Sequence, residues 1–345
     1  MQRALKIVTL FLILFFCNKS KAEINIFDGR LNIAGFAELT ITTGQPKNFR
    51  LEDPNIPKHF FIGRIASAWK YVDLALSISH GTECRKTGAI KLDSEVCIQE
   101  AKLTAKFPRN FAVTAGSDLA PFGITTIGIS RTGNVASTLP ITSLTSPYTT
   151  FGGYLQHTPS EFFSWLAGVT TWNGYLPYGE NSPLAYYAGA TIKPWYRGGD
   201  KESVVNMFFA AMPSSMLYGR LFFGDISLSL YKGRVIALVE THFGSAHDER
   251  LSWVSMSALL GIKLPKLFGI LHPVAFVGAE GYGHQNPHEL ASPTGMNIPK
   301  TMAEQIGVKI QIIPSNSPIK FNTASTCTFE NRDSFWCKIQ TGLSF

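Results

Sequence analysis

The chain has 345 residues and a formal net charge of +7, from 31 Lys and Arg against 24 Asp and Glu. Four of the basic residues and no acidic residue fall within residues 1–22, so the rest of the chain carries only +3. This near balance excludes the basic surface of a nucleic-acid-binding protein, and we expect no nucleic-acid partner.

The first 22 residues have the pattern of a secretory signal peptide. Two basic residues precede an apolar run over residues 7–17, and Ser20-Lys21-Ala22 offers a cleavage site with a small residue at each end. The run is too short for a comfortable membrane span. We therefore expect residues 1–22 to be removed on export and residues 23–345 to form one domain, since no Pro/Ser-rich linker or repeat divides them.

Several later segments alternate apolar and polar side chains with the two-residue period of a β-strand. Residues 71–81 place Val72, Leu74, Leu76 and Ile78 on one face and Asp73, Ala75, Ser77 and Ser79 on the other. Residues 220–231 and 305–312 repeat the pattern. These segments do not show the period of an amphipathic helix, so they predict strands.

The longest apolar stretch, residues 251–282, has to be tested as a membrane-spanning helix. Lys263-Leu264-Pro265-Lys266 interrupts it and leaves two pieces that are too short to span as helices but long enough to span as tilted strands. Export, an apolar stripe and no helical span together predict an all-β fold. That fold is a transmembrane antiparallel β-barrel, which satisfies every backbone polar group inside a bilayer.

The alternation predicts about 16 strands, an even number as expected for a single-chain barrel with both ends on one side. The expected strands are residues 31–41, 59–69, 71–81, 97–107, 111–120, 150–158, 162–172, 184–195, 204–212, 220–231, 234–244, 252–264, 272–283, 302–313, 318–329 and 335–345. Short connections at 69–71, 108–110, 232–233 and 314–318 should alternate with long ones at 42–58, 121–149 and 284–301. Weaker alternation over residues 184–220 and 264–272 leaves one hairpin more or fewer open.

Four cysteines remain after export to an oxidising compartment, namely Cys84, Cys97, Cys327 and Cys337. They form two close pairs in the sequence, and we expect disulfides Cys84–Cys97 and Cys327–Cys337, each across a hairpin tip. Four cysteines allow three connectivities, so crossed pairing and free thiols stay open. The spacings are not those of structural zinc ligands.

The last predicted strand ends the chain on an aromatic residue. One face carries Phe335, Cys337, Ile339, Thr341, Leu343 and Phe345, and the other carries Trp336, Lys338, Gln340, Gly342 and Ser344. The first face suits lipid and the second suits water. Because chain ends usually fray in solvent, this pattern indicates a strand that closes a barrel, with a strand of a soluble sandwich as the alternative.

Four segments carry a resemblance to a known family: LNIAGFAELTITT, QEAKLTAKFPRNFAVTAGSDLAPFG, GVTTWNG and the terminal IQTGLSF. In these the chain resembles the porin-like outer-membrane β-barrels of Gram-negative bacteria. The resemblance implies short periplasmic turns, long extracellular loops and passive diffusion of small hydrophilic solutes or ions through a water-filled channel. It also implies outer-membrane lipid as a partner, no cofactor and no catalytic residues, and it is compatible with a homotrimer.

In such a barrel the side chains that face the lumen set selectivity. The charged inward positions are predicted to be Arg64, Lys102, Lys309, Lys320 and Lys338, against Glu38, Asp73, Glu100, Asp118, Asp225 and Glu240. Closure brings the last three strands beside the first two, so the lysines of those last strands would form a basic arc with Arg64. The alternative is that these are ordinary solvated lumen residues.

Residues 123–148 form a long connection in which Arg131 is the single charge. Porins similar to this chain fold a loop into the channel at this position. We expect an opening lined by Ser and Thr hydroxyls with Arg131, which would favour neutral solutes or weakly favour anions. An exposed loop that contacts a partner or a neighbouring subunit is the alternative.

Catalytic and metal sites have weaker support in the sequence. His284 and His288 have a ligand-like spacing, but Pro287 and the neighbouring Gly and Asn place them in a loop, so we expect no metal there. No Gly-x-Ser-x-Gly elbow, P-loop or dinucleotide motif occurs. We expect no enzyme; a barrel hydrolase, and a barrel that serves as an adhesin or structural protein, are the alternatives.

Trp and Tyr residues near strand ends are expected to form girdles at the membrane interfaces. They are Trp69, Tyr71, Trp165, Trp172, Tyr186, Tyr187, Trp195, Tyr196, Tyr231 and Trp336. In a soluble sandwich the same residues would be core.

Overall fold

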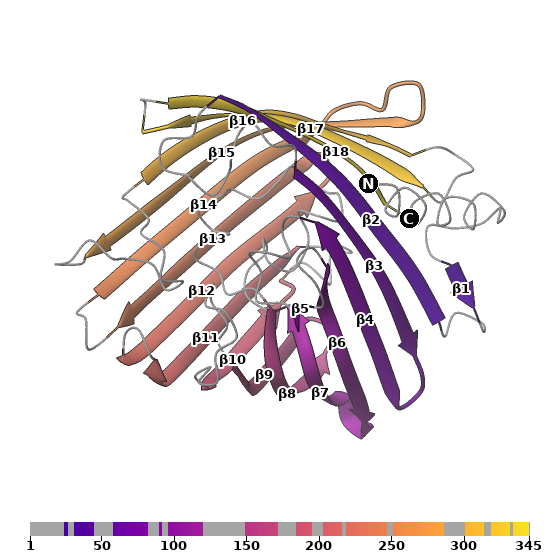
Figure 1. The fold of residues 1–345 in the computed structure, drawn as a ribbon, viewed down its shortest axis with the longest axis vertical. Coiled ribbons are helices and arrows are strands. Elements are labelled where there is room, and N and C mark those ends of the chain that lie inside the picture. Colours follow the sequence, from indigo (N-terminus) through magenta and orange to yellow (C-terminus); the bar gives the residue numbers. More distant parts are fainter. Residues whose placement is uncertain are drawn as a thin grey trace.

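A computed structural model describes residues 24–26, 31–44, 58–81, 90–91, 96–119, 149–171, 184–194, 203–215, 219–246, 251–285, 301–313, 319–331 and 334–344. In this part of the chain sixteen long strands and two short ones form one sheet (Figure 1). The last strand pairs with the first long strand, from Trp336 opposite Gly44 to Ser344 opposite Phe36. This pairing closes the sheet into a barrel.

The strands are β1 (Ile24–Ile26), β2 (Leu31–Gly44), β3 (Lys58–Ala68), β4 (Val72–Gly81), β5 (Ile90–Lys91), β6 (Val96–Phe107), β7 (Phe111–Leu119), β8 (Thr149–Ser160), β9 (Phe163–Thr171), β10 (Leu184–Ile192), β11 (Val204–Ser215), β12 (Gly219–Lys232), β13 (Val235–Ala246), β14 (Leu251–Lys263), β15 (Leu271–Gln285), β16 (Thr301–Ile312), β17 (Lys320–Glu330) and β18 (Ser334–Ser344). Every long strand is antiparallel to its neighbours. The described residues contain no helix long and apolar enough to cross a membrane.

The sixteen predicted strands are confirmed, each overlapping one long strand of the barrel. The bounds shift by at most three residues, outward as at β2, which continues to Gly44, or inward as at β10, which ends at Ile192. The short strands β1 and β5, which pair with β2 and β6, were not predicted. Two or three residues are too few to show a period. The expected signal peptide and Phe345 lie outside the described residues.

The predicted alternation of short and long connections is wrong in part. The connections 69–71, 108–110 and 233–234 are short and share one end of the barrel, here called the short-turn rim, and 45–57, 120–148 and 286–300 join strands at the other end, the loop rim. However, 216–218, 247–250 and 331–333 also join strands at the loop rim. A few residues suffice to connect antiparallel neighbours at either end, so connection length does not identify the rim.

The two faces of the sheet differ in polarity. On β4, Leu74 and Ile78 are 49% and 42% exposed, whereas Ser77 and Ser79 are 2% and 0% exposed. In a closed single-layer sheet the exposed series faces outward and the buried series faces the lumen. The outer face is therefore apolar and much of the inner face is polar, as predicted.

The inner face nevertheless has an apolar part near the short-turn rim. There Ile236, Leu259, Val274, Phe276 and Ala324 form a buried cluster on β13 to β17, with Tyr231 and Leu238 packed against it. This cluster lies inside the barrel, and other buried apolar residues such as Phe208 and Phe223 are not part of the cluster.

Gly233 and Gly244 are two of the glycines that local geometry requires. Gly233 has φ +60° in the turn between β12 and β13, a conformation that L side chains rarely adopt. Gly244 lies beneath the Trp253 ring of the neighbouring strand, and a Cβ there would overlap that ring and come 2.6 Å from the Phe222 carbonyl oxygen. An aromatic ring thus covers a glycine across the strand pair.

The residues predicted to form aromatic girdles divide between exposed and buried positions. Trp69, Tyr71 and Tyr186 are exposed on the barrel, but Tyr187 and Trp336 are buried. The prediction for these two is wrong because each belongs to the inner series of its strand, and nearness to a strand end does not decide the face. Trp172, Trp195 and Tyr196 lie outside the described residues.

The predicted disulfide between Cys327 and Cys337 is present. The two residues are directly opposite in the register of β17 and β18. Thr326, Thr328 and Trp336 are buried on the inner face, so the disulfide belongs to the outer face. Cys84 and the side chain of Cys97 lie outside the described part of the chain, and their pairing stays a prediction.

Candidate functional site

Among the described residues, charged side chains of the inner wall form two clusters of three or more polar groups. One lies on β3, β4 and β6 around Glu100, and the other lies on β12 and β13 around His242. The order of strands around the sheet places the two clusters on nearly opposite sides of the barrel.

The Glu100 cluster is built by the register of three adjacent strands. Arg64 on β3 is opposite Ser77 on β4, and Ser77 is opposite Glu100 on β6. Arg64 Nε donates a hydrogen bond to Glu100 Oε2 at 2.8 Å, and Ser77 Oγ donates to the same oxygen at 2.8 Å. Lys102, two residues along β6 on the same face, places Nζ 2.9 Å from Glu100 Oε1.

The Glu100 cluster carries a net positive charge that remains open to solvent. The side chains of Arg64 and Lys102 are 43% and 23% exposed, whereas that of Glu100 is 10% exposed. Two cations thus surround one carboxylate and present their exposed parts to the lumen. Such an arrangement attracts anionic groups and repels cations, to an extent that salt reduces.

A separate ion pair lies close to the short-turn rim. Lys106 Nζ is 2.7 Å from Asp73 Oδ1, and both side chains are about one-third exposed or more. An exposed pair of this kind contributes little to stability. Its two charges offset each other, so Asp73 adds little to the field inside the barrel.

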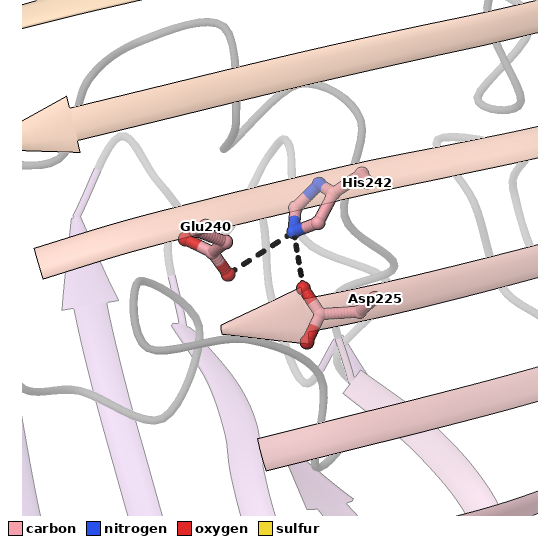
Figure 2. Close-up of side chains that lie close together, drawn as sticks. All are labelled: Asp225, Glu240 and His242. Atoms are coloured by element: carbon pink, nitrogen blue, oxygen red, sulfur yellow. Dashed lines mark hydrogen bonds and ion pairs between the residues drawn. The ribbon is translucent and has the colours of Figure 1, made fainter. Parts of the chain in front are cut away.

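The His242 cluster is buried in the opposite wall (Figure 2). His242 Nε2 is 2.9 Å from Asp225 Oδ2 and 3.0 Å from Glu240 Oε1. Asp225 lies directly opposite His242 across β12 and β13, and Glu240 precedes His242 by two residues on the same face of β13. The turn at Gly233 fixes this register and so brings the three side chains together.

The wall that holds the His242 cluster is closed to solvent at most polar positions. On β12 to β16 the inner residues Ser227, Ser229, Ser255, Ser257, Glu280 and Gln305 are buried. Accessible charge is found instead on the wall of β3 to β6, where Arg64 and Lys102 lie. The two sides of the lumen are therefore unequal.

The predicted pore-lining residues fall into three groups. Arg64, Glu100 and Lys102 meet in one cluster, Asp225 and Glu240 meet in the other, and Asp73 pairs with Lys106. Lys309 is buried on the inner wall, and Lys320 and Lys338 are half-buried. The side chains of Glu38 and Asp118, and the whole of Arg131 with the segment 123–148, lie outside the described residues.

The predicted basic arc is changed by these contacts. β16, β17 and β18 do lie beside β2 and β3, as closure required. Arg64, however, is ion-paired with Glu100, which offsets part of the charge that it would add to the lysines of the last strands. An arc made by those lysines alone stays a prediction.

Ser77, Lys106 and His242 were not predicted as site residues. The sequence held a signal for His242: a two-residue turn at 233–234 puts positions 225 and 242 opposite each other. No comparable signal existed for Arg64 and Glu100. A register shift between Ser77 and Ile78 in the β4–β6 pair sets their alignment, and a bulge is not visible in the alternation.

No family model matches the chain, and no curated protein matches it. Solved structures match over most of its length. OprB of Pseudomonas putida aligns with a TM-score of 0.58 and 7% identity over 91% of this chain and 94% of its own. The outer membrane channel DcaP of Acinetobacter baumannii has a TM-score of 0.58 and 10% identity over 91% and 97%.

OmpT, an outer membrane protein of Vibrio cholerae, in a form that lacks loop L8, aligns with a TM-score of 0.55 and 7% identity over 91% of this chain and 99% of its own. At these identities the likeness concerns the fold alone. The chain has the fold of outer-membrane β-barrel porins and channels.

Proposed function

We propose that this chain is an outer-membrane porin, which forms a water-filled channel for passive diffusion of small hydrophilic solutes. The observation that carries the proposal is a closed barrel of sixteen long strands with an apolar exposed face and a largely polar inner face. A closed barrel leaves no unpaired sheet edge in a bilayer, and sixteen strands leave room for an aqueous lumen. The proposal includes cleavage of residues 1–22 and no enzymatic activity.

The solute path in this proposal follows the wall of β3 to β6. Arg64 and Lys102 expose charge there, whereas the polar residues of β12 to β16 are buried. With one carboxylate between two cations, the path suits neutral polar solutes and small anions better than cations. Lys320 and Lys338 would add to the same preference.

Liposome swelling tests the proposal. Liposomes that contain the refolded protein should swell in neutral sugars, at rates that fall with solute size, while protein-free liposomes do not. Arg64→Glu should leave the rate for a neutral sugar unchanged and slow the entry of a small organic anion. Absence of swelling with a protein that migrates as a folded barrel would refute the diffusion channel.

A second candidate is favoured by one observation. Asp225 and His242 on the inner wall are 0% exposed, which suits a barrel whose lumen is closed and whose loop rim is the working surface. Such a barrel would act as an adhesin or structural protein. It would insert into liposomes with the same strand content yet give no swelling.

A homotrimer is part of the proposal and has separate support. In-vitro folded Vibrio cholerae OmpT is described in a trimer form. Light scattering of the detergent-solubilised protein should give a mass of three chains, and a mass of one chain would remove this part of the proposal without affecting the channel.

A further inference from the structure

We infer that Asp225, Glu240 and His242 bind one divalent transition-metal ion of the zinc type inside the barrel wall. These three residues form a group of His, Asp and Glu donors within 4.8 Å of one another, drawn from two adjacent strands. This inference concerns a different part of the lumen from the solute path proposed above and does not depend on it.

The two distances from the His242 nitrogen to the carboxylate oxygens are close to those between neighbouring donors of a single ion. Metal-to-donor distances for His nitrogen and carboxylate oxygen are about 2.0–2.2 Å, so neighbouring donors of one ion lie about 3 Å apart. His242 Nε2 is 2.9 Å from Asp225 Oδ2 and 3.0 Å from Glu240 Oε1. The dashed lines in Figure 2 show both carboxylates converging on the same ring nitrogen.

A hydrogen bond alone accounts poorly for this convergence. An imidazole nitrogen carries at most one hydrogen, which lies in the plane of the ring and points in one direction. Two carboxylate oxygens from different strands approach Nε2 at nearly the same distance. A metal ion between the three donors would use the Nε2 lone pair and contact both oxygens at once.

The charge and the burial of the three donor side chains also favour a bound cation. Asp225 and His242 are 0% exposed and Glu240 is 2% exposed. Two carboxylates and a neutral imidazole sum to a formal charge of −2, and protonation of the imidazole still leaves −1. A divalent cation held by the three donors would bring the formal charge of this set to zero.

The donor types narrow the choice of ion. Ca²⁺ and Mg²⁺ prefer sites made wholly of oxygen donors, in greater number. One imidazole with two carboxylates suits zinc and its neighbours among the divalent transition metals. Because the donors are buried and belong to the strands themselves, the ion would hold β12 to β13 and would not be a transported solute.

Metal content of the whole refolded protein tests the inference. After dialysis against a chelator, the protein is loaded separately with Zn²⁺, Mn²⁺ or Ca²⁺, freed of excess ion, and analysed by mass spectrometry of its metals. We expect one tightly bound zinc ion per chain and no retained calcium. His242→Gln and Asp225→Asn should each weaken zinc binding by at least about tenfold.

Matched controls separate the site from general surface binding. His272→Gln at the short-turn rim and Glu304→Gln on the outer face should retain zinc like the wild type. Equal zinc in the wild type and in His242→Gln would overturn the inference, as would loss of zinc in all four variants alike.

A second measurement keeps the test valid if the variants do not fold. X-ray absorption at the zinc edge of the wild-type protein should show a first shell of nitrogen and oxygen with the outer scattering of one imidazole. A sulfur shell, or oxygen without imidazole, would contradict the site. Equal thermal stability of the wild type with zinc and with chelator would also contradict it, because ion binding to the native state alone must stabilise that state.

Discussion

Glu100 lowers the positive charge that its cluster presents to the lumen. Its carboxylate holds Arg64 and Lys102 within 2.9 Å and offsets one of their two charges. Its own side chain is mostly buried, so ions in the lumen encounter chiefly the exposed cations. The electrostatic character of this wall therefore depends on a residue that solutes scarcely contact.

Replacement of Glu100 by Gln should shift the channel toward anions. The substitution keeps the size of the side chain and removes its charge, which leaves Arg64 and Lys102 uncompensated. A unit charge at contact distance in water contributes about 1 kcal/mol, so the local anion concentration should rise by up to about fivefold. The reversal potential in a salt gradient measures the change.

Glu304→Gln is the control for this prediction. Glu304 is exposed on the outer face of β16. Its substitution by Gln removes the same charge at a distance from the lumen. If both variants gave the reversal potential of the wild type, Glu100 would have no influence on ion passage.

At the scale of the strands, Gly244 is a position of tight cross-strand packing. Substitution by Ala should destabilise the barrel by about 1–3 kcal/mol, because the new methyl group overlaps the Trp253 ring and crowds the backbone of β12. The midpoint of unfolding in guanidinium chloride measures the effect.

Gly283→Ala is the matched substitution. The atom nearest to an added Cβ there is Val254 Cγ1 at 4.0 Å, and the backbone needs no positive φ. This variant should have the same midpoint of unfolding in guanidinium chloride as the wild type. Equal midpoints for the two alanine variants would show that the Trp253 ring can move aside.

The hairpin of β17 and β18 is tied by the disulfide between Cys327 and Cys337, ten residues apart. Replacing both cysteines by Ser should lower the free energy of unfolding by about 2–3 kcal/mol, since a closed loop of this length restricts the unfolded chain. A reductant should lower the wild-type midpoint of unfolding at least to that of the double variant. A further reductant effect in the double variant would report the predicted disulfide of Cys84 and Cys97, whereas equal stability of the oxidised wild type and the double variant would contradict the prediction for Cys327 and Cys337.

The strands themselves were predictable because alternation is a local property. Val72 to Ile78 and Ile306 to Ile312 show the period directly, and each lies on the predicted strand with the predicted face outward. The face of a side chain near a strand end was harder to predict. Tyr187 and Trp336 are buried, although their position along the chain suggested a girdle.

The contacts within the two charged clusters could be predicted only where the alignment of neighbouring strands could be predicted. Asp225 and His242 meet across a two-residue turn, so their contact follows from the sequence once that turn is recognised. Arg64 and Glu100 are separated by β4, and a register shift intervenes. Long-range contacts of this kind depend on how strands align, which the two-residue period does not encode.

For the whole molecule, the proposed porin requires that the apolar outer face meets a bilayer. Ile306, 57% exposed at the middle of β16, should tolerate a charge badly, whereas Met302 near the loop rim should tolerate it well. We expect Ile306→Arg to cost about 2–4 kcal/mol in lipid and Met302→Arg about 0–1 kcal/mol. Unfolding from phospholipid vesicles measures both. Equal costs at the two depths would contradict a membrane-embedded belt.

The closed barrel of the proposed porin has one functional consequence that does not depend on the identity of the solute. A barrel with lipid outside and water inside must conduct ions. The most direct test is the single-channel conductance of the refolded protein in a planar bilayer. We predict stable steps of uniform size, with a reversal potential that moves toward the anion value in Glu100→Gln. A protein that inserts as a folded barrel and gives no steps would contradict the channel.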